Sequence, residues 1–335
     1  MSFETYLKQI KSGRSLSRDE AKTFLGLIIE NESLPDRVVA EVLTALTEKG
    51  VNAEEICGLV DAMRMHMVHV PYTGQAIDTC GTGGDKTGTF NISTATALLL
   101  AAGGVTVAKH GNRAATSKCG SADVLEALSI PVDLAPEAAA RALHEQKFVF
   151  LFAPMYHPAL KRLSIVRKQL GFPTVFNLLG PLLNPAGVKR QVIGTFSLTN
   201  AKLLAEVASK MGYEHAMVIT SDDGLDEASL SAPVRVFEIK QDKISESVLN
   251  AADYGLKPAP ISALQGGDAT QNAKLITAAL KPAKILSAHQ EIIVFNAALG
   301  FYVAGSTASI EASVKKASQV LASGQALDKL QELSG

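Results

Sequence analysis

Residues 78–94 read DTCGTGGDKTGTFNIST, and three of the four residues at positions 81–84 are glycine. Glycine at this density lets a backbone approach another group closely. The stretch is not a Walker P-loop, because Asp85 stands where the glycine before Lys86 is required. It is not a dinucleotide fingerprint either, because Lys86 occupies the last glycine position of that motif.

The surrounding residues favour an anion as the ligand of this glycine loop. Residues 76–79 can end a strand, and residues 93–100 form a plausible helix with Ser93 near its start. A glycine loop between a strand and a helix N-terminus directs free backbone N–H groups and the helix dipole at a phosphate. The alternative is a loop that only connects two elements.

A second loop with phosphate-binding character follows the strand-like residues 105–108. Residues 109–117 read KHGNRAATS and bring cations, a glycine and hydroxyls together: Lys109, His110, Gly111, Arg113, Thr116 and Ser117. Such a loop at the carboxyl end of a parallel strand is suited to bind an anion, although a solvated basic turn is the alternative. Ser121 then opens a helix over 124–128, either as its N-cap or as another phosphate donor.

Residues 221–227, SDDGLDE, place four carboxylates behind the strand-like residues 216–220. Carboxylates this close repel one another unless solvent or a cation separates them. The order of ligands does not match an EF-hand loop. Asp226 and Glu227 suit an open Mg²⁺ site completed by water and substrate phosphate, and an acidic surface turn is the equal alternative.

The pattern of elements predicts two parts. Residues 1–68 contain only helical signals, including a capping box at 17–20 and helix starts at Pro35 and Asn52. After a break at 70–74, helices alternate with short apolar strands at 105–108, 148–152, 191–196, 216–220 and 235–239. This alternation predicts an α/β fold with a mostly parallel central sheet flanked by helices. A helical stretch over 157–171 is expected to return to the first part.

Composition narrows the class of protein. The chain has 335 residues, of which 47% are hydrophobic and 19% charged, as in a folded globular protein. A formal net charge of -1 argues against general binding to nucleic acid or to an acidic membrane. The N-terminal residues have no apolar signal core, and Cys57, Cys80 and Cys119 show no Cys-x-x-Cys spacing. A reduced, cytoplasmic protein is therefore expected.

Taken together and in order, six motifs resemble the anthranilate phosphoribosyltransferase family. They are GTGGD at 81–85, NIST at 91–94, KHGNR at 109–113, GSAD at 120–123, FNLLGPL at 176–182 and DGLDE at 223–227. The resemblance implies a smaller all-helical domain of residues 1–70 with an insert from about 160–190, and an α/β domain of residues 71–335 without that insert. It also implies a homodimer formed through the helical domains, Mg²⁺ as cofactor, and a step of tryptophan biosynthesis.

The resemblance assigns site residues position by position. It implies Lys109, Arg167, Asp226 and Glu227 as catalytic residues, Ser93, Asp226 and Glu227 as Mg²⁺ ligands, and Gly81, His110, Asn112 and Arg167 as anthranilate contacts. For phosphoribosyl diphosphate (PRPP) it implies Gly81, Gly84, Asp85, Thr89, Asn91, Ile92, Ser93, Thr94, Lys109, His110, Gly111, Asn112, Arg113, Ala114, Ala115, Thr116, Ser117 and Ser121.

Two residues leave questions open. Pro173 stands where the family often has arginine, and Asp85 either faces the diphosphate across Mg²⁺ and water or fixes the loop by accepting backbone N–H bonds. Two other functions compete with the transferase. A pyrimidine nucleoside phosphorylase, which resembles this family in fold, does not need the pair Asp226 and Glu227 or Arg167. A nucleic-acid-binding paralogue is disfavoured by the net charge.

Overall fold

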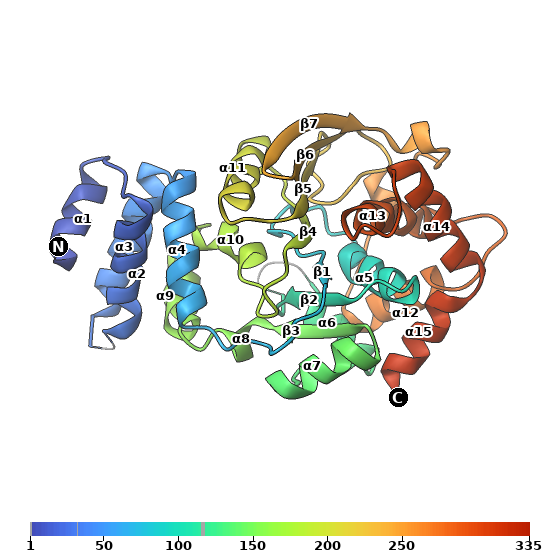
Figure 1. Ribbon diagram of the computed structural model, residues 1–335, viewed down its shortest axis with the longest axis horizontal. Coiled ribbons are helices and arrows are strands. Elements are labelled where there is room, and N and C mark those ends of the chain that lie inside the picture. The colour runs from blue at the N-terminus through green and yellow to red at the C-terminus, as the bar shows by residue number, and fades with distance from the viewer. Residues whose placement is uncertain (1, 32, 115–117) are drawn as a thin grey trace.

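A computed structural model describes residues 2–31, 33–114 and 118–335 of the chain. It has an all-helical part, at the left of Figure 1, and a larger α/β part, as the sequence predicts. The chain enters the helical part with α1 (Phe3–Lys11), α2 (Arg18–Glu30), α3 (Asp36–Lys49) and α4 (Ala53–Met65). No helix in the described ranges is long and apolar enough to cross a membrane.

The predicted starts of the first helices are confirmed. Ser17 and Glu20 form a capping box on α2, and Asn52 and Glu55 form another on α4. Pro35 is the N-cap of α3. Each capping box satisfies backbone N–H groups that the first turn of a helix otherwise leaves free, so these starts are encoded locally.

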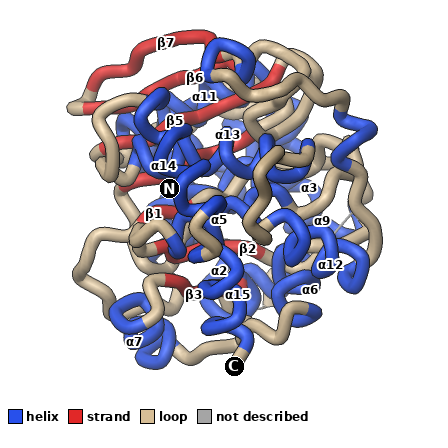
Figure 2. Tube along the Cα trace, turned by 90° about the vertical axis from the view of Figure 1, so that its right-hand side faces the viewer, coloured by secondary structure: helices blue, strands red, loops and turns tan. Residues whose placement is uncertain are grey.

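The α/β part is built on one sheet of seven strands in the order β3-β2-β1-β4-β5-β6-β7. The strands are β1 (Ile77–Asp78), β2 (Val107–Gly111), β3 (Phe148–Phe152), β4 (Arg190–Gly194), β5 (His215–Ser221), β6 (Val234–Lys240) and β7 (Lys243–Leu249). The first five are parallel, and β6 and β7 are antiparallel additions at one edge. Figure 2 shows β7 and β3 at the opposite edges.

Strand order reverses between β1 and β4. The chain winds from β1 through β2 to β3 in one direction, then restarts at β4 beside β1 and continues to β5. Ligands of open parallel sheets bind beyond the carboxyl ends of the strands at such a switch point. The glycine loop leaves β1 here, and Gly194 ends the adjacent β4.

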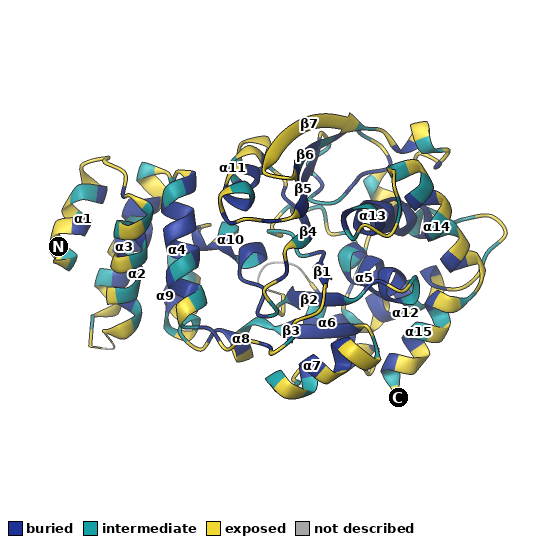
Figure 3. Cartoon of the chain, in the orientation of Figure 1, coloured by how far each residue is buried: buried dark blue, intermediate teal, exposed yellow. Residues whose placement is uncertain are grey.

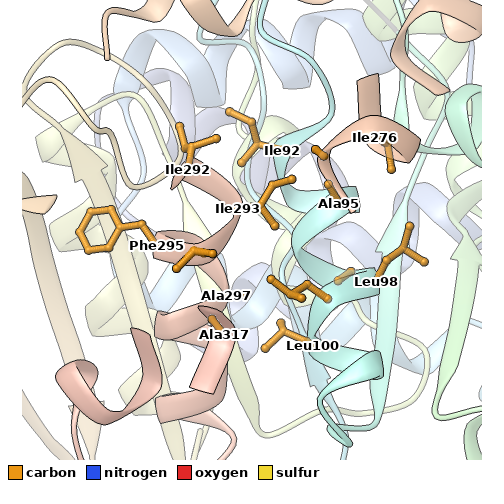
Figure 4. Close-up of a cluster of buried hydrophobic side chains, with 14 of the residues drawn as sticks. Ile92, Ala95, Leu98, Leu100, Ile276, Ile292, Ile293, Phe295, Ala297 and Ala317 are labelled. Carbon is orange, nitrogen blue, oxygen red and sulfur yellow. The ribbon is translucent and has the colours of Figure 1, made fainter. Parts of the chain in front are cut away.

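Helices cover both faces of the sheet because residues along its strands alternate between two cores. Met217 and Ile219 of β5 face one core, and Ala216 and Val218 face the other. Figure 4 shows the first core, where α5 (Ile92–Ala102) meets α12 (Ala269–Ala279), α13 (Ala288–Val303) and α14 (Ile310–Ala322). The second core joins α11 (Leu198–Lys210) to α4, so it ties the helical part to the sheet.

The remaining helices are short or peripheral. They are α6 (Ser121–Ala127), α7 (Pro136–Glu145), α8 (Ala153–Tyr156), α9 (Leu160–Leu170), α10 (Phe176–Leu179) and α15 (Gln325–Ser334), with 3-10 turns at Gly180–Leu182, Ala251–Tyr254 and Ile261–Leu264. As expected for the central helical stretch, α9 packs on α3 and α10 on α4 (Figure 1). The exact domain boundaries, 1–70 with the 160–190 insert and 71–335, stay a prediction.

One expectation about the strands is wrong, and one strand was not predicted. Lys109, His110 and Gly111 do not begin a loop but complete β2, because their backbone pairs in register with Phe150, Leu151 and Phe152 of β3. The sequence also did not predict β7, whose residues are almost all exposed (Figure 3). Such a strand lacks the apolar alternation that a half-buried strand shows.

Candidate active site

The glycine loop lies against the end of β4 and the acidic turn after β5. A Cβ atom on Gly194 would come within 1.7 Å of the Asp226 carbonyl oxygen, so only glycine fits there. A Cβ atom on Gly81 would lie 3.0 Å from the Gly194 carbonyl oxygen and 3.3 Å from Asp226 Oδ2. Thr82 N–H donates to the Gly194 carbonyl oxygen at 2.8 Å. Close backbone approach therefore brings Gly81 next to the Asp226 carboxylate.

Asp85 fixes the shape of the glycine loop. Its carboxylate accepts hydrogen bonds from Thr87 N–H at 3.2 Å and from Thr87 Oγ1 at 2.7 Å. Gly84 adopts the left-handed region at φ +85°. Asp85 also faces Asp226, whose pKa it helps to raise. The structure therefore supports the loop-fixing role for Asp85 and places the same carboxylate beside the acidic turn.

The loop continues into the N-terminus of α5. Thr89 forms an isolated bridge with Gln265, and Asn91 is the N-cap residue of α5. Within the described ranges the Asn91 side chain makes no capping hydrogen bond. Ile92, Ser93 and Thr94 form the first turn, where backbone N–H groups and the helix dipole favour an anion.

Lys109 is a buried cation that faces the loop. Only 1% of its surface is exposed, and its Nζ lies 3.5 Å from Thr79 Oγ1. Among the described residues no carboxylate forms an ion pair with this ammonium group, although its charge opposes the rise that burial causes in the pKa values of Asp78 and Glu227. A buried charge is costly unless it is paired, so Lys109 is prepared for an anionic ligand.

The four carboxylates of the acidic turn separate into two kinds. Asp222 forms an ion pair with Arg235, and Asp223 accepts hydrogen bonds from the hydroxyls of Ser229 and Ser231. Asp226 and Glu227 have no cationic partner of this kind within the described chain. The first two carboxylates therefore fold the turn and leave the second two for a ligand.

Asp226 and Glu227 have the chemistry of a divalent-cation site. Burial and the neighbouring Glu227 and Asp85 raise the pKa of Asp226 well above its usual range, and burial raises the pKa of Glu227 to about 7. Ser93 lies beside Glu227 and opposes this rise in the pKa of the Glu227 carboxyl. The described chain holds no cluster of three or more metal-ligating side chains. Two hard carboxylates suit Mg²⁺, which retains water and phosphate ligands.

His110 is held in a pair of buried imidazoles. Its Nδ1 bonds the Gly180 carbonyl oxygen at 3.1 Å, and its Nε2 lies 3.2 Å from Nε2 of His157. Burial and the neighbouring His157 lower the pKa of His110 to about 3, so the ring is neutral near pH 7. Because a carbonyl can only accept, the His110 proton is on Nδ1.

Arg167 is a partly buried cation on α9 without an acidic partner in the described part of the chain. Its Nη2 donates to Asn177 Oδ1 at 3.2 Å, and its guanidinium lies 5.8 Å from the centre of the Phe176 ring. Burial lowers its pKa. Phe176 and Asn177 belong to α10, which leads directly to Gly180 and so to His110. Arg167 and His110 are therefore linked through the contacts of residues 176–180.

Other predicted residues are arranged differently. Arg113 pairs with Asp123 and Glu126 of α6, so its guanidinium is not free to bind a phosphate in this structure. Ser121 is not an N-cap, because Gly120 is the N-cap residue of α6. The Gly120 N–H donates to the Asp123 carboxylate at 2.8 Å. Asn112 is exposed, and the N–H of Ala114 donates to Asp123. Ala115, Thr116 and Ser117 lie outside the described residues.

Sequence reasoning missed several residues that support the site. Asp78 is fully buried at the end of β1, and its carboxylate accepts from His110 N–H at 3.3 Å and from Asn184 Nδ2 at 2.8 Å. An aspartate that ends an apolar strand beside a glycine loop was the available signal. No signal in the sequence pointed to His157 or Asn184, because the roles of both residues depend on contacts between residues far apart in the chain.

Lys109→Ala is expected to raise the apparent Michaelis constant (KM) for PRPP about tenfold or more and to leave the constant for anthranilate largely unchanged. One hydrogen bond to a charged group contributes roughly 1.5–3 kcal/mol. Steady-state kinetics with each substrate varied in turn measures both constants. An unchanged constant for PRPP would remove Lys109 from the site, and Lys86→Ala, in the exposed part of the glycine loop, is the control.

Comparison with known families and structures agrees with this geometry. Residues 73–327 match the α/β domain of a glycosyl transferase family, and residues 4–67 match its helical bundle domain. Anthranilate phosphoribosyltransferase of Geobacillus sp. (strain WCH70) is 43% identical over 331 residues, which cover 99% of this chain and 97% of that protein.

Two solved structures are also similar. The anthranilate phosphoribosyltransferase of Thermus thermophilus has a TM-score of 0.91 at 39% identity, with 98% of both chains covered. The Saccharomyces cerevisiae enzyme in complex with PRPP and Mg has a TM-score of 0.89 at 26% identity, covering 99% of this chain and 96% of that one. This chain therefore belongs to the anthranilate phosphoribosyltransferase family.

Proposed function

We propose that the chain transfers the phosphoribosyl group of PRPP to the amine of anthranilate, giving N-(5-phosphoribosyl)anthranilate and diphosphate in tryptophan biosynthesis. One observation carries this proposal. Four features converge at the switch point of the sheet. They are the glycine loop, the open N-terminus of α5, the ammonium group of Lys109, which has no ion-pair partner among the described residues, and the carboxylates of Asp226 and Glu227. This is a site for a metal-bound diphosphate.

Breaking the bond between ribose C1 and oxygen leaves positive charge on the sugar and negative charge on diphosphate. The N–H group of Thr94 and the ammonium group of Lys109 are fixed before the reaction and stabilise the departing negative charge. Lys109 cannot turn into solvent, because only 1% of its surface is exposed. Leaving-group stabilisation and positioning are the main source of acceleration.

Mg²⁺, which we assign to Asp226, Glu227 and Ser93, neutralises diphosphate charge when it is bound. The fit of these residues rests on two adjacent buried carboxylates that form no ion pair within the described chain, with Ser93 beside Glu227. The yeast relative was crystallised in complex with PRPP and Mg, which supports the proposal that PRPP and Mg²⁺ bind together here. Asp85 holds the glycine loop, which we expect to contact both Mg²⁺ and the diphosphate.

Anthranilate is assigned to the region between Arg167 and His110. A guanidinium can bond both oxygens of a carboxylate, and Arg167 has no carboxylate partner among the described residues. The yeast enzyme has also been crystallised with 4-fluoroanthranilate. The amine of anthranilate is neutral near pH 7, so it attacks ribose C1 without a strong base. Arg167 and His110 orient the amine toward that carbon.

Loss of anthranilate fluorescence on incubation with PRPP and Mg²⁺ tests this function. We expect the loss to require both additions and to be matched by release of diphosphate. No loss, together with phosphate-dependent cleavage of thymidine, would instead identify a nucleoside phosphorylase.

We also propose a homodimer formed through the helical part, in a reduced, cytoplasmic protein. The described chain has three free cysteines. A hollow beside α2, α3 and α9 is lined by two cationic and seven apolar residues: Lys161, Arg162, Ile28, Ile29, Val39, Pro158, Ala159, Leu163 and Ile165. The Ile165 side chain is 51% exposed, which a second copy of this face would cover.

Ile165→Glu is expected to convert the dimer to a monomer in light scattering at low micromolar concentration, because a charge in an apolar interface is costly. Ile244→Glu is the matched control, since Ile244 of β7 is 45% exposed on the far edge of the sheet. A monomeric parent protein, or a dimer that survives Ile165→Glu, would contradict this assignment.

A further inference from the structure

Asn272 of α12 is a buried amide that contacts the start of α5. Only 2% of its surface is exposed. Its Nδ2 donates to Asn91 Oδ1 at 2.8 Å, and its Oδ1 accepts from Gly267 N–H at 2.7 Å. Asn91 Nδ2 in turn donates to the Cys119 carbonyl oxygen at 3.2 Å. Both ends of the Asn91 amide are thus bonded to groups outside α5.

Asn91 is thereby kept from the role that asparagine usually has at this position. A side-chain oxygen at an N-cap normally accepts from the N–H group two or three residues later. Asn52 does so on α4, with a ψ angle of 175° and a bond of 2.9 Å from Glu55 N–H. Asn91 has a ψ angle of 74° and makes no such bond within the described ranges.

We propose that Asn272 is a positioning residue for the diphosphate site, an inference that rests on the proposed function. By holding Asn91 Oδ1, it prevents the amide from capping Thr94 and leaves the Thr94 N–H group to the leaving group. Without Asn272, Asn91 is free to turn to an ordinary N-cap conformation and to occupy the space of a phosphate oxygen.

The segment before Asn272 also holds the glycine loop in place. Gly266 N–H donates to the Gly88 carbonyl oxygen at 2.9 Å, and Phe90 N–H donates to the Leu264 carbonyl oxygen at 3.0 Å. Asn272 fixes the end of this segment through Gly267. One side chain therefore sets both the direction of Asn91 and the path of the loop that leads to it.

Asn272→Ala is expected to weaken binding of Mg²⁺-diphosphate about fivefold, because the free Asn91 side chain would compete for the N–H group at the start of α5. Calorimetry measures this affinity. The apparent constant for PRPP should rise by the same factor, and that for anthranilate should not change.

Asp268→Ala is the control for general damage to α12. Asp268 caps this helix by accepting from Gln271 N–H at 2.8 Å, and this bond is separate from those that hold Asn91. The substitution should lower the melting temperature without changing diphosphate affinity. If Asn272→Ala does not fold, Asn272→Asp keeps the shape but cannot donate to Asn91.

The outcomes separate this inference from the proposed function. Unchanged diphosphate affinity in a folded Asn272 variant of an active parent overturns the positioning role alone. A parent that lacks transferase activity but whose diphosphate affinity depends on Asn272 overturns the proposed function alone. A parent that does not bind diphosphate overturns both.

Discussion

Asp226→Asn combined with Glu227→Gln is expected to lower turnover by about a hundredfold or more at millimolar Mg²⁺ and to raise the Mg²⁺ concentration needed. Both amides keep the size of the carboxylates but lose the charge that a hard cation prefers. Stabilising a departing charge through a metal contributes several kcal/mol to the barrier, and about 1.4 kcal/mol corresponds to a factor of ten. Initial rates measured across a Mg²⁺ series give both quantities.

Asp222→Asn is the matched control for this pair. Asp222 lies in the same turn but is bonded to Arg235 on the surface, so its loss should leave the Mg²⁺ dependence unchanged. A double variant with the Mg²⁺ dependence of the parent would mean that Asp226 and Glu227 form only a structural turn.

Arg167→Ala is expected to raise the apparent constant for anthranilate by between roughly tenfold and a hundredfold, while PRPP binding changes little. The loss of a charge-assisted contact of ~1.5–3 kcal/mol sets this range. Arg167→Lys should recover only part of the loss, since an ammonium group cannot make two parallel bonds to a carboxylate. Steady-state constants for the parent and both variants test the series.

Lys168→Ala supplies the control, because this lysine is the next residue on α9 and is exposed. It should behave like the parent protein. Loss of PRPP binding in Arg167→Ala with anthranilate binding retained would move the aromatic acid away from α9.

Much of the fold was predictable because its signals are local. The capping residues Ser17 and Asn52 start helices through bonds to their near neighbours. The apolar run of β3 was predicted with its observed bounds, Phe148–Phe152, since strands buried on both faces lack polar interruptions. The order of glycine, hydroxyl and acidic motifs was sufficient to predict the family.

The remaining features depend on contacts that spacing does not reveal. Lys109 is a strand residue because β3 happens to pair with it, and Arg113 is held by carboxylates ten or more positions later. The buried Asp78 acquires its partners from β2 and from Asn184, 106 positions away. Asn272 contacts Asn91 across 181 positions, so no local pattern points to it.

We propose that separate groups hold the two substrates in this protein. The most direct test is to measure the apparent Michaelis constants for PRPP and anthranilate in Lys109→Ala and Arg167→Ala. Both variants should be measured beside the parent at one saturating Mg²⁺ concentration. We predict that Lys109→Ala raises only the constant for PRPP and that Arg167→Ala raises only the constant for anthranilate. The reverse pattern, or an equal rise of both constants in both variants, would contradict it.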